Sequence, residues 1–251
     1  MKMKVIYHPR YCQVYTSDPA AAPGRMESIC NHISPYFEIV EPQPAAIDDI
    51  SLIHSEPHIE DIRHQGLTYD LALLAAGGAI SAAESAFQGE PAFGLIRPPG
   101  HHASRDHCWG FCFFNNMAIS VTKLRKEKKV HRVVIVDIDL HYGDGTANIF
   151  RDEPEVSYFH AEGKNRQKYI DSLAEFLGHQ QADIIAVSAG FDRHEDDWGG
   201  LLKTEDYHTI GKLVKEFAKK VCRGRRYGVL EGGYNHQVLG KNVKAFLDGM
   251  A

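Results

Sequence analysis

The chain has 251 residues, of which 43% are hydrophobic and 24% charged, and its formal net charge is -5 at pH 7. This composition is ordinary for a soluble globular protein, and the negative balance argues against nucleic acid as a partner, because such binding needs clustered Lys and Arg to neutralise phosphates. The N-terminus carries lysines but no apolar core of a signal peptide, and no apolar run approaches the ~18 residues of a membrane span, so we expect neither secretion nor membrane association.

Short apolar runs alternate along the chain with longer segments of helical periodicity. The first strand is predicted over residues 4–8, and helices over residues 25–37, 55–66 and 68–89. Ser55 is placed to cap the second helix, and the Gly77–Gly78 pair in the third would allow close packing. Further strands are predicted over residues 92–96, 132–140, 155–160, 183–190 and 226–233, and further helices beginning near Asn116, Asp144, Asn165, Thr204 and His236.

This alternation is typical of an α/β protein whose parallel sheet is covered by helices on both faces. No linker or low-complexity block marks a boundary, so residues 1–251 are expected to form a single domain. In parallel sheets, ligands bind outside the carboxyl ends of the strands. The polar clusters of the sequence all fall at such ends: "RPPGHHA", "DIDLHYGDG", "AGFD" and "EGGY". We therefore expect them to meet at one edge of the sheet.

The stretch "VVIVDIDLHYGDG" over residues 133–145 begins as a buried strand and then places acids on it. Strand alternation would put Asp137, Asp139 and His141 on one face. Asp192 ends another strand and adds a further carboxylate. Two carboxylates and one imidazole are a typical ligand set of a catalytic zinc, and a divalent cation would turn their mutual repulsion into attraction. The predicted metal ligands are Asp139, His141 and Asp192.

The same pattern, taken alone, leaves other interpretations open. The ion could be structural or calcium-like, or the carboxylates could accept from backbone N–H groups, although a histidine ligand disfavours calcium. A zinc site formed by His107, Cys108 and Cys112 is a weaker alternative, because it is a single cluster of irregular spacing. The five cysteines are an odd number without a Cys-x-x-Cys pair, which favours a reduced protein of the cytoplasm.

A Pro-Pro-Gly turn presents two adjacent imidazoles, His101 and His102. They are candidate catalytic bases, although a histidine pair in a loop can equally lie on the surface. Asp137 and Asp144 are not needed as metal ligands, and each can accept from one imidazole and raise its basicity. Tyr234 in "LEGGYN" is a candidate donor to a developing oxyanion, with packing on the rim as the alternative.

With these residues assembled, the sequence resembles the zinc-dependent histone deacetylase superfamily, which includes acetylpolyamine amidohydrolases and the acetoin-utilisation proteins. The resemblance runs from "YHPRY" to "EGGYN", nearly the whole chain, and is closer to the class II branch and its bacterial relatives than to class I. Its markers are "GRMESI", "LLAAGGAI", "RPPGHHA", "GFCFFNN", "VDIDLHYGDGT", "SAGFDRHEDDWGGL" and "LEGGYN". The fold it implies is the arginase/deacetylase type, a three-layer αβα arrangement around a central parallel sheet.

The resemblance also implies roles for the candidate residues. His102 would be the main general base and acid with Asp144 behind it, and His101 paired with Asp137 would be its electrostatic partner. The zinc would lie on the three ligands predicted above, with Fe²⁺ as an alternative native metal, and a structural K⁺ would lie near it on the strand bearing Asp137 and Asp139. Tyr234 would supply the hydroxyl that stabilises the transition state, and Gly110 and Phe111 would line the slot for the substrate.

The implied activity is hydrolysis of an N-acetyl amide, either acetyl-lysine in a protein or a small acetylated amine, with release of acetate. Alternatives are hydrolysis of larger acyl groups or esters, and binding of acyl-lysine without turnover. The sequence departs from the family at Tyr142, where a second histidine is usual. It also lacks the long loop that would follow Gly163, so we expect a shallower channel, partly walled by Trp198.

Overall fold

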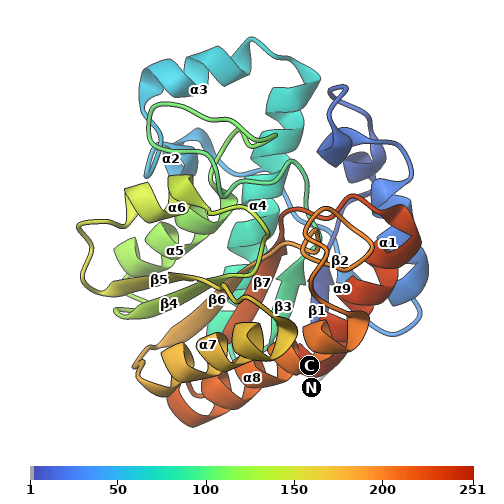
Figure 1. Cartoon of the computed structure of the whole chain (residues 1–251). Helices are drawn as coiled ribbons and strands as arrows, with labels where there is room; N and C mark the ends of the chain where they lie inside the picture. The colour runs from blue at the N-terminus through green and yellow to red at the C-terminus, as the bar shows by residue number, and fades with distance from the viewer. Residues whose placement is uncertain (1–2) are drawn as a thin grey trace.

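The computed structural model describes residues 3–251, and its centre is a sheet of seven parallel strands (Figure 1). The strands are β1 (Lys4–Ile6), β2 (Glu38–Val40), β3 (Ala92–Gly94), β4 (Val133–Asp137), β5 (Val156–His160), β6 (Ile184–Ala189) and β7 (Arg226–Leu230). Their spatial order is β2-β1-β3-β7-β6-β4-β5, and every neighbouring pair is parallel. The predicted parallel α/β sheet is therefore confirmed.

Helices cover both faces of this sheet. The helices are α1 (Arg25–Ile33), α2 (Ile47–Ile50), α3 (Glu56–Arg63), α4 (Leu67–Phe87), α5 (Asn116–Lys126), α6 (Asp144–Ile149), α7 (Arg166–Gly178), α8 (Thr204–Val221) and α9 (His236–Met250). Figure 1 shows α7, α8 and α9 on one side of the strands and α4 with α5 on the other. The strands β4, β6 and β7 are buried along their whole length, as expected for a sheet covered on both faces.

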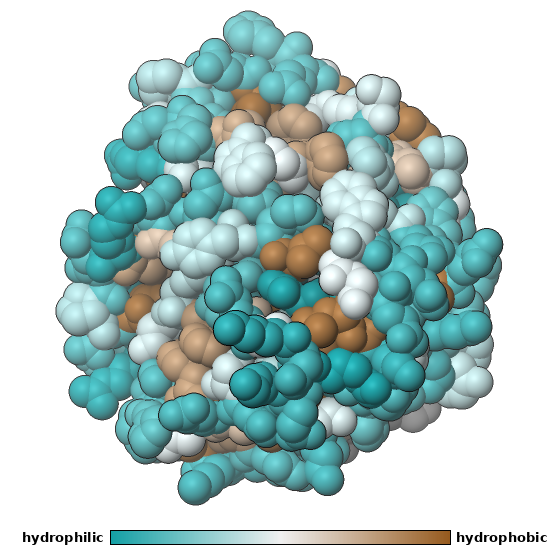
Figure 2. All heavy atoms as spheres, in the orientation of Figure 1, coloured by the Kyte–Doolittle hydropathy of each residue, from teal (hydrophilic) through white to brown (hydrophobic). Residues whose placement is uncertain are grey.

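The strand order brings the polar motifs together. The strands β3, β7, β6 and β4 are consecutive neighbours in the sheet, and each is followed by one of the four polar clusters. Because all strands are parallel, these loops leave the sheet at the same edge. Figure 2 shows a largely hydrophilic surface on the face seen in Figure 1, with apolar side chains gathered in small separate groups.

Some local predictions differ from the structure. The strand expected over 132–140 ends at Asp137, and the following residues form a turn. Ser55 does precede α3, but its side chain makes no capping hydrogen bond. The edge strand β2 was not predicted, because its three residues include an exposed Glu38 and Ile39 and do not form a buried apolar run.

The helix α4 forms the centre of one helical layer. It is long and apolar enough to cross a membrane by length and composition, but 67% of its most apolar window is buried inside the fold. Its contacts are with β1, β3, β7 and α5, so its apolar surface is used within the protein. At Gly77, an added Cβ would collide with the backbone of Gln43 and Ala45, which explains why the glycine pair packs closely here.

Replacing Gly77 by alanine is therefore expected to destabilise the protein by about 3 kcal/mol, at the upper end of the cost of overpacking. The measurement is urea unfolding followed by circular dichroism. Gly178 is the matched control, because it also lies in a helix but an added Cβ would meet nothing within 4 Å. Gly178→Ala should be neutral or stabilising by up to about 1 kcal/mol. Equal unfolding free energies for both variants would contradict the packing argument.

Candidate active site

The loops that follow β3, β4, β6 and β7 enclose a cavity of about 120 Å³ at their common edge of the sheet. Its walls contain most of the residues singled out from the sequence. The lining residues are Pro99, His101, His102, Trp109, Gly110, Phe111, His141, Trp198, Gly232 and Tyr234. Asp139 and Asp192 lie beside His141, which lines the cavity, so the structure brings the predicted ligands and the predicted bases close together.

The three predicted metal ligands converge. The Nδ1 atom of His141 lies 3.2 Å from Asp139 Oδ1 and 3.1 Å from Asp192 Oδ2. The sequence placed Asp139 and His141 together on a strand, but they meet through a turn in which the Asp139 carboxylate accepts from the backbone N–H of His141 at 2.9 Å. The side chains of Asp139 and Asp192 are almost completely buried, with 1% and 0% exposure.

Backbone donors orient these carboxylates but leave one oxygen free. Asp139 Oδ2 accepts from the N–H of Gly232 at 2.8 Å, and Asp192 Oδ1 accepts from the N–H of Leu140 at 2.9 Å. Asp192 Oδ2 is buried without a hydrogen-bond donor and faces the imidazole. A buried, unpartnered carboxylate oxygen beside a second carboxylate and an imidazole nitrogen fits a cation, and this mixed set of nitrogen and oxygen ligands suits zinc.

Even without a metal, the charges of the protein favour a positive charge next to Asp139 and Asp192. Burial, together with the charge of Asp139, raises the pKa of Asp192 to about 6. The adjacent carboxylates of Asp139 and Asp192 raise the pKa of His141 to about 10, so in the absence of a metal the imidazole holds a proton beside them. A divalent cation would displace that proton, because metal ligation requires the imidazole to be neutral.

Two imidazole–carboxylate pairs lie next to the predicted metal ligands. His101 Nδ1 is 3.0 Å from Asp137 Oδ2, and His102 Nδ1 is 2.7 Å from Asp144 Oδ1. The two histidine rings are only 4.0 Å apart between centroids. Asp137 is further held by the hydroxyl of Tyr158, which donates to Oδ2 at 2.9 Å.

These two histidines have opposite protonation behaviour. Burial opposes a charge on His101, but the carboxylates of Asp137 and Asp139 outweigh it and raise its pKa. Burial and the neighbouring His101 lower the pKa of His102 to about 4, despite its bond to Asp144. His102 is therefore neutral at neutral pH and able to accept a proton, while His101 supplies positive charge beside it.

The phenol of Tyr234 faces the cavity between two aromatic rings. Trp198 stacks on it with centroids 4.1 Å apart, and Phe111 meets it edge-on at 6.1 Å. Burial and the charge of Asp139 raise the pKa of Tyr234, so the phenol keeps its proton and can donate it to a hydrogen bond. Gly110 has φ +59°, and a Cβ there would lie 2.5 Å from the ring of His102. Glycine is thus required for the loop to approach the imidazole.

Trp109 belongs to the site but was not predicted from the sequence. Its indole Nε1 donates to Asp144 Oδ2 at 2.9 Å, and its ring covers His102 with centroids 4.0 Å apart. The signal in the sequence was its position directly before Gly110 in "HCWGFC", but nothing there connects it with an aspartate 35 residues away. Trp109 therefore both shields the imidazole and holds the carboxylate that orients it.

Trp109→Ala is expected to move the acidic limb of the kcat/KM profile to higher pH. Uncovering the imidazole removes part of the desolvation that lowers the pKa of His102, and the freed Asp144 carboxylate favours the protonated form further. A higher pKa means that the base is lost earlier as the pH falls. Trp109→Phe keeps an aromatic ring over the imidazole and loses only the hydrogen bond to Asp144, so the acidic limb of its kcat/KM profile should shift less. Superimposable profiles for the parent and both variants would contradict this role.

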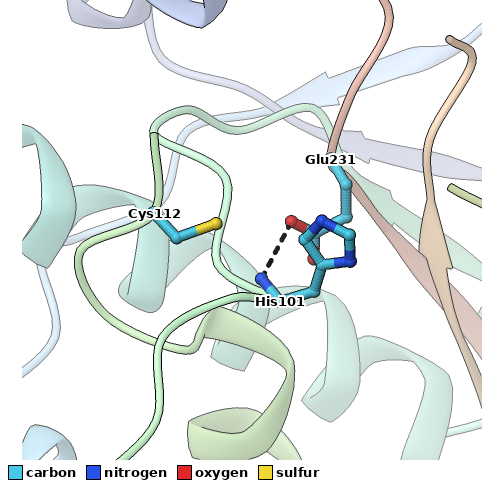
Figure 3. Close-up of side chains that lie close together, drawn as sticks. All are labelled: His101, Cys112 and Glu231. Carbon is cyan, nitrogen blue, oxygen red and sulfur yellow. Dashed lines mark hydrogen bonds between the residues drawn. The ribbon is translucent and has the colours of Figure 1, made fainter. Parts of the chain in front are cut away.

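A second cluster of possible metal ligands lies behind the histidine loop, formed by His101, Cys112 and Glu231 (Figure 3). The carboxylate of Glu231 accepts from the N–H groups of Gly100 and His101 at 2.7 and 3.2 Å and from the hydroxyl of Ser188 at 3.2 Å. Burial raises the pKa of the Cys112 thiol, which keeps it protonated and a poor ligand. Through these hydrogen bonds, Glu231 fixes the loop that carries His101 and His102. This role of Glu231 was not predicted.

The expected shortening after β5 is also visible. Only a short segment around Gly163 connects β5 to α7, and Tyr142 is an exposed residue whose ring lies 5.9 Å from Tyr158. Trp198 is half exposed and lines the cavity, as does the half-exposed Trp109. The resemblance implies K⁺ on the turn after β4. The carbonyl oxygens of residues 137–140 accept hydrogen bonds from the protein, those of Asp139 and Leu140 from the positively charged Arg193, so these carbonyls do not fit a second cation.

Comparisons with known proteins agree with this geometry. Residues 20–169 and 161–250 match the histone deacetylase domain family. The chain is 32% identical to a probable deacetylase of Methanothermobacter thermautotrophicus over 99% of this chain and 90% of that protein. It is 29% identical to polyamine deacetylase HDAC10 of Danio rerio, over 90% of this chain but only 39% of that protein.

A solved structure supports the fold in the same way. The crystal structure of the HDA15 HD domain aligns with a TM-score of 0.85 and covers 100% of this chain and 91% of that one, at 21% sequence identity. At this identity the likeness concerns the fold, and it agrees with the arginase/deacetylase arrangement expected from the sequence.

Proposed function

The chain belongs to the histone deacetylase family, and we propose that it is a zinc-dependent deacetylase that hydrolyses the N-acetyl amide of acetyl-lysine in proteins or of a small acetylated amine. The observation that carries this proposal is the convergence of Asp139, His141 and Asp192, with the unpartnered Asp192 Oδ2, directly below a neutral imidazole paired with a carboxylate. Fe²⁺ is the alternative metal within the same proposal. The chain is proposed to act in the cytoplasm, in keeping with its free cysteines.

Zinc, when bound to these ligands, supplies Lewis acidity toward the substrate carbonyl and toward water. The residues of the chain then divide the proton transfers between them. His102 accepts a proton from the attacking water while Asp144 holds its Nδ1–H, and the resulting imidazolium returns the proton to the leaving amine. His101, charged through Asp137, stabilises negative charge in the pocket without transferring a proton.

The substrate carbonyl oxygen gains negative charge as water attacks. The phenol of Tyr234 is protonated and faces the same cavity, so it can donate to that oxygen. The stem of the substrate would pass between the aromatic side chains of Phe111 and Trp198, which both line the cavity. The narrow volume of about 120 Å³ suits a small acyl group such as acetyl.

A second candidate, hydrolysis of longer acyl groups or esters, is favoured by one observation. Trp109 and Trp198, which line the cavity, are both half exposed. Small rotations of these tryptophans would admit a larger acyl chain. This candidate uses the same catalytic residues and differs only in the substrate.

The test is acetate or acid release by the zinc-loaded protein from acetyl-lysine peptides, acetylated polyamines and longer acyl-lysines, compared as kcat/KM. We expect acetyl amides to be preferred over longer acyl groups. A preference for long acyl chains would support the second candidate instead. Tight binding of every acyl amide with no release from any of them would contradict both.

A further inference from the structure

The turn that carries the metal ligands Asp139 and His141 is held by hydrogen bonds to its own carbonyl oxygens. The carbonyl of Asp137 accepts from the N–H of Ala161 at 2.9 Å, and that of Ile138 accepts from the Tyr169 hydroxyl at 3.3 Å. Two adjacent carbonyls, of Asp139 and Leu140, remain, and both point at one side chain. That side chain belongs to Arg193, which directly follows the ligand Asp192 in the chain.

A single nitrogen of Arg193 contacts both of these carbonyls. Its Nη2 atom donates to Leu140 O at 3.0 Å and to Asp139 O at 3.2 Å, and lies 3.2 Å from His160 Nε2. The guanidinium also stacks over the ring of Tyr169 at 5.2 Å, and the residue is only 9% exposed. These partners are all neutral, so the guanidinium is a buried cation stabilised by carbonyl dipoles, an imidazole nitrogen and an aromatic face.

The backbone of Arg193 is also held by hydrogen bonds. Its carbonyl accepts from the N–H groups of Leu201 and Leu202 at 3.1 and 2.9 Å. The guanidinium therefore links the loop after β6, which carries the ligand Asp192, to the turn after β4, which carries the ligand Asp139. Movement of either loop would break these contacts.

Backbone carbonyl oxygens are also the ligands that proteins use to hold K⁺. Here the positive charge of the guanidinium is already in contact with the carbonyls of Asp139 and Leu140, and a second cation at the same place would be repelled. The expectation of K⁺ from the resemblance is therefore not met by the residues of this turn, for a physical reason that lies in Arg193.

We propose that Arg193 is a built-in replacement for a monovalent cation: it positions the ligand residue Asp139 through its carbonyl and makes the metal site and its activity independent of K⁺. Arg193 acts through Asp139 and Leu140, so it is a positioning residue. This role goes beyond deacetylation, because metal affinity and thermal stability are also expected to be independent of K⁺ in the absence of substrate.

The first experiment uses the parent protein. K⁺ is titrated against tetramethylammonium at constant ionic strength, and Tm, zinc affinity by chelator competition and kcat/KM are measured. We expect all of them to stay constant, because an ion that bound the native state would raise Tm in proportion to the logarithm of its concentration. A saturable rise of Tm and zinc affinity with K⁺ would overturn the proposal even if the protein had no deacetylase activity.

The second experiment uses Arg193→Ala in buffer free of K⁺. Zinc affinity and kcat/KM should fall by about 10- to 100-fold, as for the loss of groups that orient metal ligands. Added guanidinium ion or K⁺ should restore several-fold of that loss by binding the carbonyls of Asp139 and Leu140 that the substitution leaves free. Arg193→Lys, which keeps the positive charge, should lie between the parent and the alanine variant, and it remains informative if Arg193→Ala fails to fold.

The matched control is Arg226→Ala. Arg226 is also buried, at 4% exposure, and its guanidinium also donates to backbone carbonyls, those of Met250, Gly224 and Ala251, but it lies at the start of β7, away from the site. Loss of the Arg226 side chain should lower Tm. Added guanidinium or K⁺ should not change the zinc affinity or kcat/KM of this variant. If the two alanine variants lose the same zinc affinity and neither is rescued, Arg193 has no positioning role and the proposal fails.

Discussion

Asp192→Ala is expected to lose both its bound zinc and its activity. The carboxylate supplies the unpartnered oxygen beside His141, so its removal takes away one of the three ligands. The loss of metal-derived transition-state stabilisation should lower kcat/KM by on the order of a thousandfold or more. Zinc content by elemental analysis and acetate release are measured on the same sample.

Asp196→Ala is the matched control, because Asp196 is an exposed aspartate in the same loop and only approaches His194 at 3.9 Å. It should keep full zinc content and activity. Circular dichroism of both variants checks that the fold is intact. Stoichiometric zinc in folded Asp192→Ala would contradict the assignment of this ligand.

Tyr234→Phe is expected to lower kcat by about 100- to 1000-fold, as for the loss of an oxyanion donor. The phenylalanine ring keeps the stacking on Trp198 and the edge contact with Phe111, so KM and zinc content should change little. A loss confined to kcat is what distinguishes a transition-state donor from a residue that only packs on the rim.

Tyr142→Phe serves as the control, because it removes a hydroxyl from an exposed tyrosine that does not line the cavity. Its kcat should match that of the parent. Equal kcat values for Tyr234→Phe and the parent, measured on a substrate that both variants bind, would remove the phenol from the mechanism.

Much of the fold follows from patterns that are local in the sequence. Apolar strands separated by helical periodicity predicted the parallel sheet, and the rule that ligands bind at carboxyl ends predicted that the four polar motifs would meet. The predicted metal ligands converge, but partly for another reason than the sequence suggested. Asp139 and His141 were expected to align on a strand, but β4 ends at Asp137, and the backbone N–H of His141 folds back onto the Asp139 carboxylate.

The interactions that could not be predicted join segments far apart in the sequence. Glu231 holds the N–H groups of residues 100 and 101, Trp109 holds Asp144, and Arg193 holds the carbonyls of residues 139 and 140. Each is a tertiary hydrogen bond whose partner is either a backbone atom or a distant side chain. A backbone donor or acceptor leaves no trace in the residue types, and nothing in the sequence connects Trp109 with the distant Asp144, so no motif marks these contacts.

Zinc anomalous diffraction from crystals of the parent protein tests the proposed metal site most directly. We expect a single strong peak in the cavity, at about 2.0–2.2 Å from a carboxylate oxygen of Asp139, one of Asp192 and the Nδ1 atom of His141. A peak between Cys112 and Glu231 instead, or no peak in the cavity after soaking in zinc, would contradict this metal site.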